Sequence, residues 1–206
     1  MFSLFGNKSK GATSEETFWN WFISNKTRIE KFIDSKQTSY SIYNKLTEKI
    51  QTYHKLLFPE LTKDKEDRYI LVITADGLKE GLEPVQKLAA ASPKIDNWRI
   101  HKFRQPCDEI TLNLLGVEFP ASDIKILAQI DREKEVVDVD IFITNMNLDV
   151  KKYQGLACLY LDHILGEFNS ITKVGYIEFH HLEKGQNVND SITLLQLRNL
   201  IAEELY

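Results

Sequence analysis

The sequence of 206 residues has little of what normally assigns a protein to a class. It contains two cysteines, Cys107 and Cys158, which are far apart and form no CxxC motif. Two isolated thiols are typical of a reducing compartment and argue against a disulfide framework. No apolar run approaches the roughly 18–20 residues of a membrane span. We therefore expect a cytoplasmic protein without membrane association.

The sequence also lacks an excess of basic residues. Its 26 Lys and Arg against 30 Asp and Glu give a net charge of −4, which argues against general nucleic-acid binding. The first stretch, MFSLFGNKSKGATS, has an apolar patch of about five residues, whereas a secretory segment needs roughly 7–15. Residues 1–13 are therefore predicted to be a disordered tail.

Common catalytic and cofactor motifs are missing as well. The sequence has no G-x-G-x-x-G, no G-x-x-x-x-G-K-[ST], no G-x-S-x-G and no H-E-x-x-H, which are the signatures of nucleotide, hydrolase and zinc-protease sites. We expect no cofactor, and the sequence favours a binding protein over an enzyme without deciding between them.

The pattern that is present predicts an α+β protein. Thr13 and Glu16 have the spacing of a capping box, and apolar residues then recur at helical spacing as far as Pro59. Residues 14–58 are thus predicted to form an N-terminal helical hairpin. It is followed by a polar connection, LTKDKEDR, and by an α+β domain over residues 68–206 that packs with the hairpin as one unit.

Within that domain the strands outnumber the helices. YILVIT (69–74) is a continuous apolar run, typical of a strand that is buried on both faces. Residues 124–131 and 137–143 alternate between apolar and polar residues and predict an antiparallel hairpin with one wet face. We expect a mainly antiparallel sheet with helices packed on one face, a ferredoxin-like sandwich with an inserted hairpin. No repeat of 20–50 residues is evident.

The most concentrated stretch of reactive residues is NWRIHKFRQPCDE (97–109). On a strand, its side chains divide between two faces, so the apparent cluster mostly disperses. Cys107 would need a basic neighbour to act as a nucleophile. Arg104 is the residue whose partner matters most, and we expect it to clamp a carboxylate, that of Asp76 or Glu167. An enzyme would require Asp76, Arg104 and Glu167 to converge on a pocket, with one carboxyl pKa raised by burial.

Metal binding has weaker support. By alternation Glu178 and His180 lie on one strand face and supply two ligands, but zinc needs three or four. The remaining histidines form no second cluster. No metal site is therefore predicted, and Glu178 and His180 remain weak candidates.

Protein binding is the favoured function, because the first helix carries a dense aromatic cluster in FWNWF. We expect Trp19 or Trp21 to lie on an exposed apolar patch and to anchor another protein or a second copy. A further alternative is an immunity- or inhibitor-like partner of a basic toxin or nuclease, steered by Asp138 and Asp140.

Three stretches together resemble a family of uncharacterised bacterial proteins. They are FWNWF, ITADGLKEGLEPVQKLAAASPKIDNWRIHKFRQP and LDHILGEF. The resemblance spans residues 15–180 and contains no catalytic signature. It implies a bacterial, cytoplasmic protein, and because the family has no established activity it implies no mechanism.

Overall fold

The computed structural model describes residues 12–35, 39–144, 146 and 149–206. The predicted tail therefore lies almost entirely outside the described residues. The helices and strands are, in chain order, α1 (Ser14–Asp34), α2 (Ser41–Tyr53), β1 (Phe58–Lys63), β2 (Tyr69–Thr74), η1 (Lys79–Gly81), α3 (Leu82–Ala90), β3 (Trp98–Lys102), β4 (Asn113–Leu114), β5 (Val117–Glu118), η2 (Ala121–Asp123), β6 (Ile124–Asp131), β7 (Val136–Thr144), α4 (Val150–Leu165), α5 (Glu167–Lys173), β8 (Val174–Leu182) and α6 (Leu194–Glu204).

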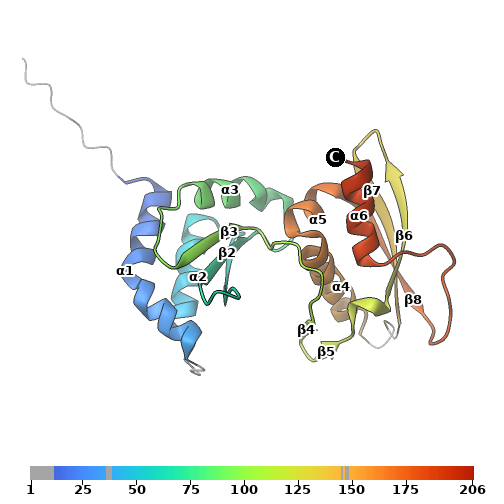
Figure 1. Cartoon of the computed structure of the whole chain (residues 1–206), viewed down its shortest axis with the longest axis horizontal. Coiled ribbons are helices and arrows are strands. Elements are labelled where there is room, and N and C mark those ends of the chain that lie inside the picture. The colour runs from blue at the N-terminus through green and yellow to red at the C-terminus, as the bar shows by residue number, and fades with distance from the viewer. Residues whose placement is uncertain (1–11, 36–38, 145, 147–148) are drawn as a thin grey trace, which may run out of the picture.

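The chain folds into two halves that lie side by side (Figure 1). The first half, α1 to β3, has an apolar core from Phe18 to Phe103, and the second half has its own core from Phe119 to Ile201. The boundary between the two cores therefore falls between Phe103 and Cys107, inside the segment 68–206 that the sequence analysis treated as one α+β domain. The helical hairpin shares one core with β2 and α3, because the apolar stripes of α1 and α2 have no other surface to cover.

In the first half the predicted helical hairpin is confirmed. Thr13 accepts a hydrogen bond from the Glu16 amide and Glu16 accepts one from the Thr13 amide, so both arms of the capping box form. The sequence missed β1, because Pro59 indicated only the end of a helix. Instead α2 ends at Tyr53, and β1 pairs antiparallel with β2 at the edge of the sheet, where proline is tolerated.

In the second half the predicted hairpin is confirmed as β6 and β7, which pair from Ile124↔Ile143 to Asp131↔Val136. Their burial alternates as a sheet with one covered face requires. Gly166 ends α4 with a φ of 81°. The sequence missed α5, a short helix that directly follows this glycine. The last helix, α6, begins at Leu194.

The α+β class is confirmed, but the strands do not form one ferredoxin-like sheet. Two three-stranded sheets have the orders β1-β2-β3 and β6-β7-β8, and β4-β5 is a separate two-stranded ribbon. In each large sheet the first two strands are antiparallel and the third is parallel to the second. The chain thus contains two ββαβ units that the sequence did not show as a repeat.

The register makes these units comparable residue by residue. Val72 of β2 pairs with His101 of β3, and Phe142 of β7 pairs with His180 of β8. Both central strands end in Ile-Thr, at Thr74 and Thr144. The helices cover one face of each sheet, since Leu71 and Ile73 belong to the first core and Ile141 and Ile143 to the second. None of the described helices is long and apolar enough to cross a membrane.

Candidate functional site

Three residues that the sequence singled out meet at the junction of the two halves. Asp76 follows β2 and Arg104 follows β3; these strands are parallel, so their carboxyl ends lie at one edge of the sheet. Glu167 begins α5 of the second half and enters this edge. The crevice at the carboxyl ends of parallel strands is where α/β sheets commonly bind ligands. Here a side chain of the protein itself occupies that position.

The carboxylate of Glu167 is held as an internal ligand. The residue is fully buried, at 0% exposure. One oxygen accepts hydrogen bonds from the Thr74 hydroxyl at 2.7 Å and the Ala75 amide at 2.8 Å, and the other accepts from the Arg104 amide at 3.0 Å. The Glu167 amide in turn donates to the Arg104 carbonyl. These hydrogen bonds connect the two halves through the side chain and the backbone of Glu167.

The guanidinium of Arg104 is saturated in the same way. Arg104 is 7% exposed. Its Nε donates to Glu60 at 2.7 Å, one terminal nitrogen to Asp76 at 2.8 Å and the other to Asp162 at 2.9 Å. The expected ion pair with Asp76 therefore forms, while Glu167 contacts the backbone of Arg104. The sequence missed Glu60 and Asp162, because their approach to Arg104 depends on the pairing of β1 with β2 and on how the two halves meet.

The charges at this junction do not balance. Four carboxylates surround Arg104: its guanidinium forms ion pairs with Glu60, Asp76 and Asp162, and its backbone amide donates to Glu167. Among the described residues, no other cation forms an ion pair with these four carboxylates. Burial lowers the pKa of the guanidinium, but Glu60, Asp76 and Glu167 outweigh it and the net pKa is raised. Burial raises the pKa of the Asp162 carboxyl to about 6, with Glu167 adding to the effect and Arg104 opposing it. Burial therefore favours the protonated form of the Asp162 carboxyl.

A cavity of about 540 Å³ adjoins this junction. Asp76, Lys79 and Asp162 give it a polar end, and its walls include Leu159, Ile171 and Ile177. Arg104 and Glu167 do not line it. The three predicted residues thus converge, but in an ion network around the buried Arg104. Of the three, only Asp76, which is exposed, lines the cavity, and the raised carboxyl pKa belongs to Asp162.

The aromatic cluster of the first helix is core and not surface. Phe18, Trp19 and Phe22 are buried, and Trp19 at 2% exposure donates its indole N–H to the Leu88 carbonyl at 2.9 Å. Trp21 is half-buried and packs against the same core. The expectation for Trp19 is therefore wrong, because α1 must cover the sheet and uses its largest rings to do so. Trp21 alone keeps part of its surface exposed.

Cys107 is not arranged as a nucleophile. Its thiol donates to the His163 carbonyl at 3.3 Å, and burial raises the pKa of this thiol, opposed by Arg198. Catalysis by a cysteine nucleophile needs a depressed thiol pKa.

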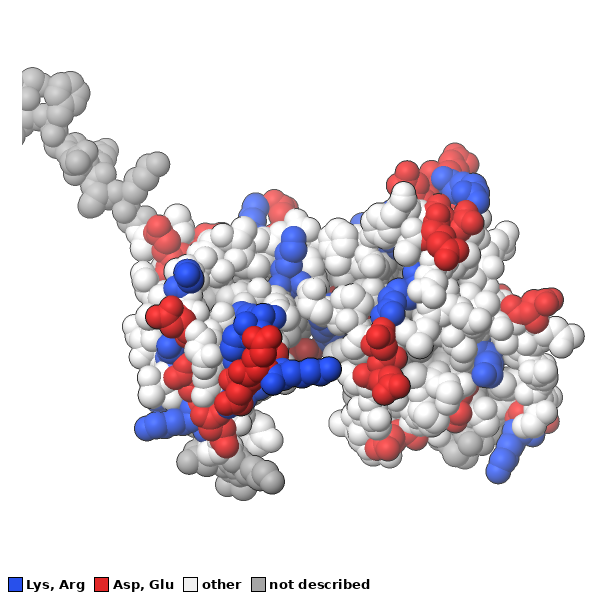
Figure 2. All heavy atoms as spheres, in the orientation of Figure 1, with Lys and Arg blue, Asp and Glu red and all other residues white. Residues whose placement is uncertain are grey.

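On the face drawn in Figure 2, acidic and basic side chains are interspersed over both halves, without a broad basic surface among the residues drawn in colour.

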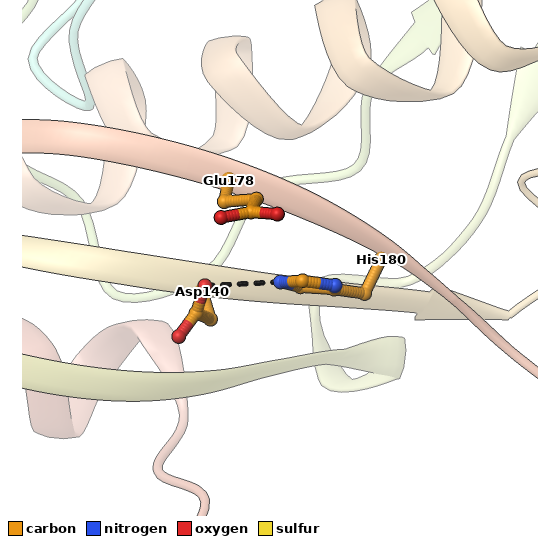
Figure 3. Close-up of side chains that lie close together, drawn as sticks. All are labelled: Asp140, Glu178 and His180. Carbon is orange, nitrogen blue, oxygen red and sulfur yellow. Dashed lines mark hydrogen bonds and ion pairs between the residues drawn. The ribbon is translucent and has the colours of Figure 1, made fainter.

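Glu178 and His180, the weak candidates for metal binding, lie next to Asp140, whose position the sequence could not predict. Glu178 and His180 lie on the uncovered face of β8, and the parallel register sets Asp140 of β7 directly beside Glu178. His180 Nε2 lies 2.9 Å from Asp140 Oδ1 (Figure 3). Alternation along one strand shows which residues share a face, but the pairing of β7 with β8 required the fold.

A second concave surface lies in the second half and is mostly apolar. It is a groove of about 490 Å³ between α6, η2 and the loop 108–111. Leu194, Leu195, Ile110 and Ala121 are among its apolar lining residues, and Asp108 and Glu109 lie at its rim. Sequence reasoning gave no signal for it, since its walls come from four separate segments, including Ile164 of α4.

Comparison with known proteins adds no name to this arrangement: no protein-family model, no curated protein and no solved structure matches the chain.

Proposed function

We propose that the protein is a non-enzymatic protein-binding module of the bacterial cytoplasm. Its two unpaired thiols fit a reducing compartment. The observation that carries the proposal is the apolar groove between α6, η2 and the loop 108–111. The proposed binding surface therefore lies in the second half of the molecule, and not at the tryptophans of α1 where the sequence analysis expected it.

The groove is held in shape before any partner arrives. Arg198 of α6 donates to the backbone carbonyls of Cys107 and Ile164 at 3.2 Å each, and it forms an ion pair with Asp108 at 2.6 Å. These bonds fix the loop against α6. A preformed groove binds more tightly than a mobile one, because less conformational freedom is lost on association.

The chemistry of the groove defines its occupant. Leu195 is 39% exposed at the wall, and large apolar side chains in pockets are typical anchors of protein interfaces. Glu109 and Asp108 supply negative charge at the rim, of which Arg198 compensates one. The proposed occupant is an apolar segment of a partner protein that is flanked by Lys or Arg.

Peptide selection on the full chain tests this proposal. We expect selected peptides to combine apolar residues with an adjacent basic residue, and Leu195→Asp to weaken their binding by at least about tenfold. The control is Leu78→Asp, because Leu78 is similarly exposed at 43% but lies in the first half. Equal loss in both variants, or selection of no peptide, would refute the groove as a protein-binding site. Capture from a lysate with the same two variants then identifies the natural partner.

An enzyme that uses the cavity between the halves is the second candidate. It is favoured by one observation: Asp162 lines the cavity with a pKa of about 6, near the value that a general acid or base needs. Arg104 and Glu167 would then keep the two halves in position and take no part in the reaction. A small molecule that co-purifies with the wild type, and is lost from Lys79→Ala but not from Leu195→Asp, would favour this candidate over the first.

The immunity-like alternative has less support from the acidic strand. Asp138 accepts a hydrogen bond from the Tyr176 amide at 2.6 Å, at an irregularity in the pairing of β7 with β8. Asp140 contacts His180. Both carboxylates thus have partners within the sheet, which leaves less free charge to steer a basic protein.

A further inference from the structure

We propose that Asp140, Glu178 and His180 form a binding site for a divalent transition metal, with zinc as the representative ion, on the uncovered face of the second sheet. The candidate ligand atoms, one from each residue, all lie within 4.8 Å of one another. Zinc binds carboxylate oxygen and imidazole nitrogen at about 2.0–2.2 Å. Small side-chain rotations therefore suffice to bring three ligands onto one ion.

The positions of the three ligands are fixed by the sheet. Asp140 and Glu178 are direct neighbours on parallel strands, and His180 follows two residues later on the same face as Glu178. The ring of Phe142 stacks on the imidazole with centroids 4.6 Å apart and an interplanar angle of 21°. This stack holds the His180 ring in place. Figure 3 shows the imidazole pointing toward Asp140. Ligands on paired strands are more rigidly placed than ligands on a loop.

The local charge favours a cation. Like charges directly opposite one another on neighbouring strands repel, and Asp140 and Glu178 are such a pair. Their neighbour on β6 is Leu127, which supplies no positive charge. The next cation on that strand, Lys125, donates to the Ser122 carbonyl. Among the described residues Glu178 makes no ion pair, and Asp140 contacts the imidazole of His180. A bound divalent ion would therefore offset the negative charge of two adjacent carboxylates that share one imidazole.

The other ββαβ unit shows that the fold does not require this triad. The equivalent positions there are Ile70, Arg99 and His101, which pair in the same register. That unit keeps the histidine but has an apolar residue and a cation in place of the two carboxylates. The combination of one imidazole with two carboxylates is thus a property of the second unit alone.

The ligand set also indicates which metals fit. Imidazole with carboxylates suits zinc and its first-row neighbours better than magnesium or calcium, which prefer all-oxygen sites. Three protein ligands leave a tetrahedral position open, as in zinc sites that bind water or a further ligand. Because the site faces outward on the sheet, that position is accessible to a small molecule or a side chain of another protein.

Zinc titration of the metal-free full chain by calorimetry tests the proposal. We expect one zinc per chain, and at least a tenfold loss of affinity in His180→Ala, since even outer-shell substitutions cost about that much. The matched control is His181→Ala, because His181 is the next residue but points to the other side of β8. NMR should show the imidazole signals of His180 shifting on zinc addition while those of His181 stay in place.

Substitution of two glutamates, one at the site and one outside it, provides an independent check. Glu178→Gln should weaken zinc binding, and Glu183→Gln should not, because Glu183 follows the end of β8. If His180→Ala perturbs the fold, as judged by its circular dichroism spectrum, Asp140→Asn takes its place in the comparison. Zinc binding of equal strength in the wild type, His180→Ala and Glu178→Gln would overturn the assignment, as would the absence of zinc binding to the wild type.

Discussion

The two ββαβ units have the same strand order and register, yet they use the second face of the sheet differently. In the first unit Ile70, Val72 and Thr74 of β2 are all buried on the face away from the helices. In the second unit the matching residues of β7, Asp140, Phe142 and Thr144, are half-buried. One topology thus supports either an apolar second face or a polar, accessible one, and the accessible one carries the proposed metal ligands.

The strongest test of this difference places the same charge at equivalent positions. Val72→Asp should reduce the free energy of unfolding by more than about 4 kcal/mol, because it buries a charge beside Glu60 on the neighbouring strand. Phe142→Asp should cost only about 1–2 kcal/mol, since its neighbours are Lys125 and His180 and water is near. Urea unfolding of both variants measures the two values. Similar losses would show that the second faces are equally covered.

The junction between the units is the next strongest contact to break. Arg104→Met should destabilise the protein by about 3–5 kcal/mol, the usual cost of removing one partner from a buried ion network. The loss arises mainly from Asp162, the buried carboxylate that would remain without its cation, because Glu60 and Asp76 are more exposed to water. Unfolding in guanidinium chloride, monitored by fluorescence, gives this value. Arg132→Met, which removes an exposed ion pair with Glu204, serves as the control and should cost less than about 1 kcal/mol.

The pH dependence of stability tests the charge excess at the same junction. The pKa of Asp162 is raised from its ordinary value of 3.8 to about 6, so the folded protein binds this proton more tightly than the unfolded chain does. Its contribution to stability is fully present below about pH 4 and is lost as the pH rises through 6, by up to about 3 kcal/mol in total. Asp162→Asn should remove this loss.

The comparison that isolates Asp162 is the difference in unfolding free energy between Asp162→Asn and the wild type. This difference should grow between pH 4 and pH 7 in favour of the variant, because all other titrating groups are common to both proteins. Asp123→Asn, at an exposed position, should show a constant difference over the same range. A constant difference for Asp162→Asn would mean that burial does not raise its pKa.

Local patterns predicted much of the secondary structure for identifiable reasons. The capping box at Thr13 and the alternation of β6 and β7 depend on residues that are close in the chain, so their spacing alone determined the outcome. The apolar run of β2 correctly indicated a strand buried on both faces. β1 was missed because its single proline is also what ends a helix, and only the partner strand distinguishes the two cases.

The candidate sites were less predictable, because each is built from distant segments. Arg104 was recognised as a residue that must find a carboxylate, and Asp76 was among those expected. The pairing with Asp162 and the capture of Glu167 by the ends of β2 and β3 depend on how the two halves meet. Likewise, tryptophan is a residue type that often anchors interfaces, but Trp19 faces the core because α1 packs against the first sheet.

By itself the sequence determined the α+β class, the helical hairpin, the β6–β7 hairpin and the importance of Arg104, because these follow from residue spacing and from the cost of burying charge. Only the tertiary structure decided that there are two ββαβ units, that Glu167 fills the edge of the first sheet, and that Asp140 joins Glu178 and His180. The physical reason is register: a strand's sequence fixes which side chains share its face, but the neighbouring strand fixes which functional groups lie within reach.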